Sequence, residues 1–142
     1  MKRRYNYLLL GFGAVWIAAM LFLTPQFIAL HQETKEALED MSGYCNNVID
    51  QQYAQAYSYS GSAFRAALSY NAFVQLYQSL QRSYGTLKAV KNQSYQVNGR
   101  GKPVVWKAII DEDFMYDKKT IPFEFVLHKE QGHWVIFSAE EL

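Results

Sequence analysis

The first thirty positions form the longest apolar stretch of the chain. No charged residue occurs between Tyr5 and Leu30. The densest part, Leu8–Leu23, has no polar side chain and would cover roughly 24 Å as a helix. With a residue or two added at each end, it comes close to the roughly 30 Å of hydrocarbon that a spanning helix crosses. The pattern therefore predicts that residues 1–30 comprise a short tip and one transmembrane helix.

The charges on either side of this segment predict its orientation. Three basic residues stand at positions 2–4, whereas acidic residues dominate between Glu33 and Asp40. Basic flanks stay in the cytoplasm. We therefore expect a cytoplasmic N-terminus, and residues 31–142 as a second domain on the other side. In a bacterium, this means a protein of the inner membrane with a periplasmic domain.

A cleaved signal peptide is the competing interpretation, because it has the same charge pattern. Residues 24–27 (Thr-Pro-Gln-Phe) occupy the place where its small-x-small cleavage site would be, so the sequence favours an uncleaved anchor. Pro25 predicts either a kink or the start of a new helix at this point. Within the anchor, Gly11, Ala14 and Ala18 provide small residues that allow another membrane helix to approach closely.

Beyond the anchor, the apolar period first indicates helices. One stripe recurs at alternating spacings of three and four, which predicts a long amphipathic helix: Leu38, Met41, Cys45, Val48, Ile49, Gln52, Tyr53 and Ala56. Cys45 belongs to that stripe, so we expect a buried thiol. A short helix from Ser62 follows, and then a helix capped by Ser69 and ended by Gly85.

After Gly85 the period changes to two, which is typical of strands. The sequence predicts an interrupted strand at Leu87–Val97, a turn at Asn98–Gly101 and a second strand over Val104–Tyr116. A third strand is predicted over Phe123–His128. Gln131-Gly132 forms the last predicted hairpin turn, with a return strand over Trp134–Phe137. About three helices followed by about four antiparallel strands make an α+β fold.

This order and three local motifs carry a resemblance. The motifs are Ser62–Ser69 (Ser-x-x-Phe-Arg-x-x-Leu-Ser as it stands here), a helix ending Arg-x-x-Gly at Arg82–Gly85, and a final strand bearing Trp134. Residues 38–138 resemble the cone-shaped nuclear-transport-factor-two-like domains, and within them uncharacterised bacterial exported members. The resemblance implies helices wrapped by a curved antiparallel sheet. An anchored domain of this kind also resembles the single-pass scaffold subunits of type IV secretion machines, which are longer.

Composition and charge exclude several classes of protein. A formal net charge of +1 gives no electrostatic argument for nucleic-acid binding. A single cysteine excludes an internal disulfide and a cysteine-built zinc site. His128 and His133 flank the last predicted turn, but no third ligand accompanies this pair. His31 follows the anchor, where an interfacial position is expected. We therefore expect no metal and no cofactor.

A cone-shaped domain can enclose a pocket, and its isomerase-like relatives use a buried carboxylate with a tyrosine or aspartate as oxyanion donor. The ligand-pocket candidates of this chain are Tyr53, Tyr77, Trp106 and Asp111. Asp111 belongs to the consecutive trio 111–113, in which Asp111 and Asp113 share one face of a strand. The simpler interpretation of the trio is a solvated strand end or bulge, so we assign no catalytic residue.

The sequence favours recognition instead. Tyr57, Tyr59 and Tyr70 surround one loop beside the helices, and tyrosine is enriched at protein interfaces. The alternative is that these rings only close the end of the domain. We therefore expect an accessory, scaffold or assembly subunit of a larger membrane complex that acts by protein contact. A module that binds a small apolar ligand, or an isomerase-like enzyme, is the second hypothesis.

Overall fold

The computed structural model describes the backbone of residues 4–142 and the side chains of residues 24–142. The chain divides into two units, residues 1–32 and 33–142. The predicted span Leu8–Leu23, with Gly11, Ala14 and Ala18, lies outside the residues whose side chains are described. Within the described residues, no helix combines the length and the apolar character that crossing a bilayer requires.

Helix α1 (Arg4–Ile49) is continuous, with Pro25 inside it, so the proposed new helix at Pro25 is not formed. From Glu33 onwards α1 belongs to the second unit. There Met41, Cys45 and Val48 of the predicted stripe are buried as expected, and Leu38 and Ile49 are partly buried. Tyr44, which is 1% exposed, is also buried there. We predicted that this stripe continues in one helix to Ala56, and that prediction is wrong. The helix ends at Ile49 because Gln51 takes a left-handed conformation with φ of 59°, and the chain turns before the next helix.

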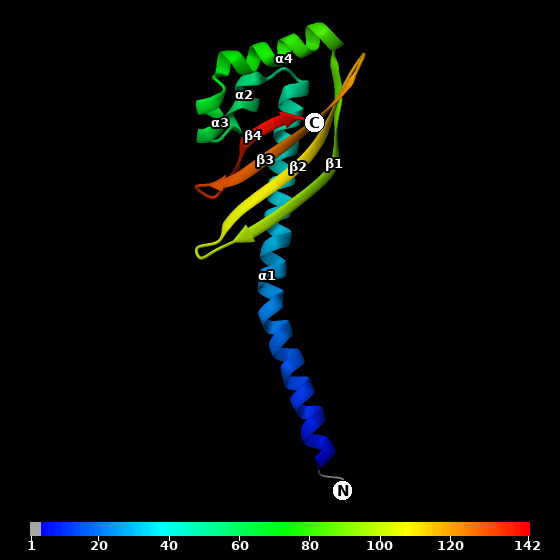
Figure 1. Ribbon diagram of the computed structural model, residues 1–142, viewed down its shortest axis with the longest axis vertical. Helices are drawn as coiled ribbons and strands as arrows, with labels where there is room; N and C mark the ends of the chain where they lie inside the picture. The colour runs from blue at the N-terminus through cyan, green and yellow to red at the C-terminus, as the bar shows by residue number, and fades with distance from the viewer. Residues whose placement is uncertain (1–3) are drawn as a thin grey trace. The chain divides into compact units, whose positions relative to one another are not determined.

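Three shorter helices follow: α2 (Tyr53–Ser58), α3 (Ser62–Ala67) and α4 (Tyr70–Tyr84). The predicted cap of α4 is confirmed, since the Ser69 hydroxyl accepts a hydrogen bond from the Ala72 amide at 3.3 Å. Gly85 ends α4 with φ of 87°, a conformation that glycine adopts without steric cost. Figure 1 shows these helices gathered at one end of the sheet.

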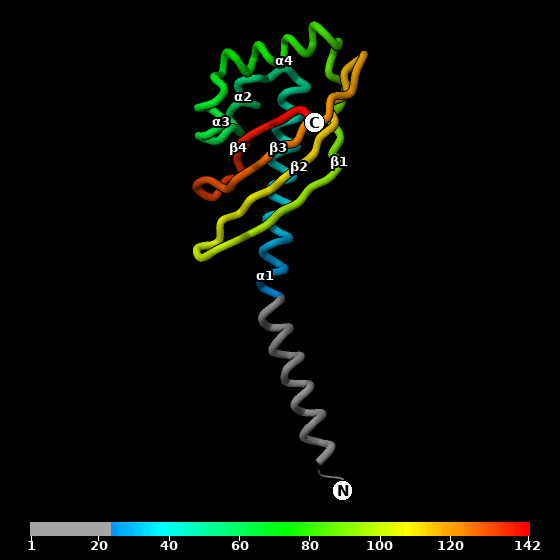
Figure 2. The backbone as a smooth tube through the Cα atoms, viewed as in Figure 1, coloured from blue at the N-terminus to red at the C-terminus, as the bar shows by residue number. Residues whose placement is uncertain are grey.

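The sheet has four antiparallel strands in the order β1-β2-β3-β4. They are β1 (Leu87–Arg100), β2 (Val105–Tyr116), β3 (Thr120–Glu130) and β4 (His133–Glu141). The α+β class with segregated helices and strands is therefore confirmed. Strands β1, β3 and β4 are longer than the predicted segments, whereas β2 begins one residue later than predicted. The backbone trace in Figure 2 shows that the β1–β2 hairpin and the β3–β4 hairpin end at separate places.

Two of the predicted turns can be compared directly with the structure. Gln131 and Gly132 form the last hairpin turn, with φ of 51° and 85°, so that prediction is confirmed. The predicted turn at Asn98–Gly101 lies slightly too early, because β1 stays paired through Arg100. The turn follows at residues 101–104, where Gly101 takes φ of 87°.

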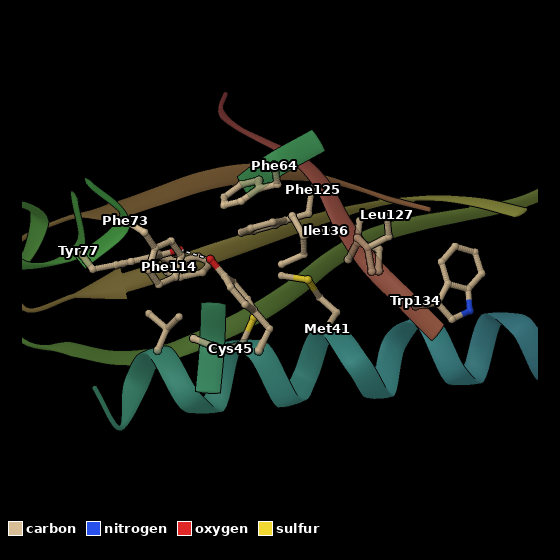
Figure 3. Packing of buried hydrophobic residues seen from close by; sticks show 14 of the residues in the cluster. Met41, Cys45, Phe64, Phe73, Tyr77, Phe114, Phe125, Leu127, Trp134 and Ile136 are labelled. Carbon is tan, nitrogen blue, oxygen red and sulfur yellow. Dashed lines mark hydrogen bonds between the residues drawn. The ribbon is translucent and has the colours of Figure 1, made fainter. Parts of the chain in front are cut away.

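The core of the second unit lies between α1, the end helices and one face of the sheet. Every second residue of β2 from Ala108 to Tyr116 points into it. Figure 3 shows α1 side chains such as Met41 meeting Phe125 and Ile136 from the strands. The alternation of β2 thus decides which of its polar residues face inwards.

Candidate functional site

The interior of the domain is filled by aromatic rings. Phe73, Phe114 and Phe125 are each fully buried. The Tyr44 and Tyr77 hydroxyls share a hydrogen bond of 2.5 Å in the middle of this cluster, drawn as a dashed line in Figure 3. Burial raises the pKa of both hydroxyls. Because these phenols stay protonated and pair with each other, they are structural groups of the core.

The space left beside these rings is small. A cavity of about 10 Å³ is lined by side chains that include Tyr53, Tyr77 and Tyr116, which is room for about one water molecule. Tyr53 and Tyr77 are stacked with their ring centroids 6.1 Å apart. Burial raises the pKa of Tyr116 to about 12. The enclosed part of this site therefore has no room for an organic ligand.

The four predicted pocket residues do not form one site. Tyr53 and Tyr77 meet, but the other two lie elsewhere. Trp106 packs over Gly99 near the hairpin end, where a Cβ on the glycine would lie 2.9 Å from the indole. Asp111 lies on the outer face of β2, where its carboxylate accepts a hydrogen bond from the Ser94 hydroxyl.

The acidic trio 111–113 lies in the interior of β2, so its placement at a strand end is wrong. The predicted irregularity exists in the partner strand instead, where the register shifts between Asn92 and Ser94. The two aspartates face outwards, as their shared spacing implied. Glu112 faces inwards and is only 6% exposed. The alternation of β2 contained this signal, since Glu112 follows Ala108 and Ile110 at steps of two.

Glu112 lies at the bottom of a groove between α1, β1 and β2, which we call the Glu112 groove. Its volume is about 280 Å³. The buried floor is made by Cys45 and Glu112, and the rim carries exposed polar residues. The complete lining is Leu38, Ser42, Cys45, Asn46, Ile49, Val90, Asn92 and Glu112. A polar floor under apolar walls is the usual composition of a small-ligand site.

The carboxyl group of Glu112 has a neutral neighbour and no cationic one. Asn92 Nδ2 donates a hydrogen bond to Glu112 Oε1 at 3.1 Å. Within the described residues, no lysine, arginine or histidine lies within ion-pair distance of it. Burial raises the pKa of Glu112, the Asn92 hydrogen bond lowers it, and the carboxylates of Asp113 and Asp111 raise it further. The groove therefore presents negative charge with no cationic partner among the described residues.

Cys45 also lies on the floor of this groove. It is 5% exposed, and burial, followed by the nearby Glu112, raises the pKa of its thiol. A thiol that is hard to ionise is a poor nucleophile. The prediction of a buried thiol is confirmed.

The predicted tyrosine cluster is mostly used for packing. The Tyr57 hydroxyl donates to the Leu68 carbonyl at 2.7 Å, and its ring lies 5.5 Å from that of Tyr70. Tyr59 packs directly on Gly43, where any side chain would collide with its ring. Tyr70 is the most exposed of the three, at 42%. The rings thus close one end of the domain.

The histidines do not form a metal site. His128 stacks on Phe137 with ring centroids 4.3 Å apart, and it pairs in register with Val135 rather than with His133. Among the described residues, no group of three or more histidine, cysteine, aspartate or glutamate side chains could hold a metal ion.

A clasp between α1 and the β3–β4 hairpin was not predicted from the sequence. Lys129 Nζ lies 2.6 Å from Glu33 Oε2 and 2.9 Å from Glu36 Oε2. Trp134 Nε1 also donates to Glu33 Oε2, at 3.1 Å. Burial lowers the pKa of Lys129, but the hydrogen bonds to Glu33 and Glu36 outweigh it and the pKa is raised. Partners 96 residues apart in the sequence leave no local signal.

The end of the β1–β2 hairpin carries the second feature of functional interest. Val104 and Val105 are 54% and 64% exposed there. We call these two residues the hairpin patch. Grouped apolar side chains on a surface are typical of interaction sites.

No family model matches the chain, and none of the curated proteins compared with it is significantly similar in sequence.

Proposed function

We propose that this protein is a single-pass membrane protein whose α+β domain acts by protein contact, as an accessory, scaffold or assembly subunit of a larger membrane complex. The orientation follows from the flanking charges, with the N-terminus in the cytoplasm and the domain in the periplasm. The nuclear-transport-factor-two-like architecture remains part of this proposal. Other membrane subunits are the expected partners.

The observation that carries the proposal is the filled interior. An interlocked aromatic core with about 10 Å³ of space beside Tyr53 and Tyr77 supports contact rather than an enclosed ligand. The second hypothesis, an apolar ligand or isomerase-like chemistry inside the domain, has less support because Asp111 and Trp106 lie away from those tyrosines. What the domain presents to a partner is therefore its surface.

Two exposed apolar surfaces support the proposal of a protein partner. The hairpin patch is exposed at the end of β1 and β2. In the first unit, Phe27 and Ile28 are 76% and 62% exposed, and they lie within the charge-free run Tyr5–Leu30. Exposed phenylalanine and isoleucine side chains are stable where lipid or another helix covers them. We propose that the anchor packs on partner helices while the hairpin patch contacts a periplasmic surface.

Photo-crosslinking in cells tests this proposal. A photoreactive phenylalanine analogue is placed at Ala14, at Val105 or, as a matched control, at Lys118, which lies exposed in the turn at the other end of β2. We expect Ala14 and Val105 to give discrete heavier adducts and Lys118 to give none. Equal labelling at all three positions, or none at Ala14 and Val105, would contradict a specific partner.

A further inference from the structure

We propose that the Glu112 groove binds a small organic ammonium ion, that is, a primary amine with a short apolar body. The inference does not depend on the proposed function, because it rests on a different surface of the domain. It rests on three properties of the groove: its size, its charge and its lining.

The size of the groove limits the ligand. A volume of about 280 Å³ lies just below the range for ligand pockets, roughly 300–1,000 Å³. The apolar walls are contributed by Leu38 and Ile49 from α1 and by Val90 from β1. A short branched alkyl group would be covered by these walls.

The charge of the groove selects a cation. A buried carboxylate is stable when a cation or several hydrogen bonds compensate it. The compensation from the described residues is the amide of Asn92, while Asp111 and Asp113 add further negative charge nearby. An anionic ligand would be repelled, and a neutral ligand would leave the charge uncompensated. An ammonium group supplies the missing positive charge.

The lining distinguishes an ammonium ion from a metal ion. Calcium and magnesium ions take six or more oxygen ligands, which usually include carboxylates. The lining contains one carboxylate, and no metal-binding group is present among the described residues. An ammonium ion has three donors. Glu112 can accept one, and the side-chain oxygens of Ser42 and Asn46 on the rim can accept the others.

The test uses the full chain in a non-ionic detergent, with carbon-13 label in its methyl groups. Isobutylamine is titrated as the probe, beside isobutanol and isobutyrate, which have the same body without the positive charge. We expect the methyl signals of Leu38, Ile49 and Val90 to shift with isobutylamine, while those of Leu76, on the exposed side of α4, stay constant. Isobutanol should bind about tenfold more weakly.

Substitution locates the charge that matters. Glu112→Gln keeps the shape and the contact with Asn92, and we expect it to weaken isobutylamine binding at least about tenfold. Asp113→Asn removes the same charge from the outer face and should change the affinity less than about threefold. If the Gln variant does not fold, a titration of the wild-type chain towards acid pH replaces it, because protonation of Glu112 should release the amine.

Three results would overturn the proposal. One is the absence of methyl shifts up to about 100 mM isobutylamine, which is far above a useful affinity. Another is equal binding of the amine and the alcohol, which would make the groove merely apolar. The third is amine binding that persists unchanged in Glu112→Gln and at acid pH.

Discussion

The rest of the chain covers the β4 edge of the sheet and leaves the β1 edge largely exposed. At the β4 edge, Ile136 makes two backbone hydrogen bonds with the segment between α2 and α3. Its amide donates to the Tyr59 carbonyl, and its carbonyl accepts from the Gly61 amide, each at 2.8 Å. The Lys129 clasp fixes α1 to the same side. At the β1 edge, the strand is largely exposed and the Glu112 groove separates it from α1.

From this difference we infer that the closed β4 edge contributes to the stability of the domain, whereas the open β1 edge is available for binding. The closed edge buries Trp134 and Ile136 and satisfies its backbone groups locally, as a stable edge should. The open edge keeps a buried carboxyl group and ends in the hairpin patch, neither of which stabilises the isolated domain. We therefore expect substitutions at the closed edge to change stability and substitutions at the open edge to change binding.

The largest expected effect comes from the buried indole of the closed edge. Trp134→Ala removes a side chain that is 2% exposed, and we expect it to lower the free energy of unfolding by about 4 kcal/mol. Tyr95→Ala at the open edge removes a half-exposed ring and should cost no more than about 1 kcal/mol. Urea unfolding of the detergent-solubilised chain, followed by circular dichroism, measures both. Equal costs would refute the distinction between the edges.

The Lys129 clasp should have the second largest effect. Lys129→Ala removes the cation that faces the largely buried carboxylate of Glu33, so we expect a loss of about 2 kcal/mol. The matched control is Lys88→Ala on β1, because the ion pair of Lys88 with Asp117 spans 3.3 Å between exposed side chains. Its loss should stay below about 1 kcal/mol. The same urea titration compares the two, and a larger loss for Lys88→Ala would count against the clasp.

A smaller effect is expected at Glu112, and it depends on pH. Burial raises the pKa of Glu112 above its usual value of 4.5, so the folded chain holds this proton more tightly than the unfolded chain. Well below pH 4.5 Glu112 is protonated in both states and no penalty exists. As the pH rises towards the raised pKa, the folded state loses stability relative to the unfolded state, and above it the penalty is constant.

Glu112→Gln should remove this penalty. We expect the variant to be more stable than the wild type by about 1 kcal/mol at neutral pH, and the difference should vanish towards pH 4. Thermal unfolding at a series of pH values measures it, with Asp113→Asn as the control. A Gln variant that is less stable at neutral pH would show that the ionised carboxylate stabilises the fold.

The smallest effect on stability is expected at the hairpin patch. Val104→Ser and Val105→Ser change exposed side chains, so the free energy of unfolding should stay within about 0.5 kcal/mol of the wild type. If the patch contacts a partner, the crosslink from Ala14 should nevertheless weaken in the double variant. An unchanged crosslink would remove the patch from the interface.

The sequence was sufficient for the elements that local chemistry determines. Alternation and turn residues identified four strands, and Ser69 and Gly85 marked the ends of α4 correctly. The end of α1 was missed because the apolar stripe continues in period beyond Ile49, while the backbone at Gln51 leaves the helical region. Periodicity alone does not record such a change.

The candidate site was less accessible to sequence reasoning. The resemblance to isomerase-like domains made Asp111 the candidate for a buried carboxylate, although the alternation of the strand puts Glu112 inwards. The Glu112 groove needs α1 and two strands together, and the Lys129 clasp joins residues about a hundred positions apart. These features arise only from the tertiary packing.

The most direct test of the proposed role is a native gel of the tagged chain. The intact chain and a version without residues 1–30 are extracted in mild detergent at their natural expression level. The account predicts that the intact chain migrates in one discrete, stoichiometric complex larger than itself and that the shortened chain is lost from it. If both versions migrate alone, the role as an accessory subunit is contradicted.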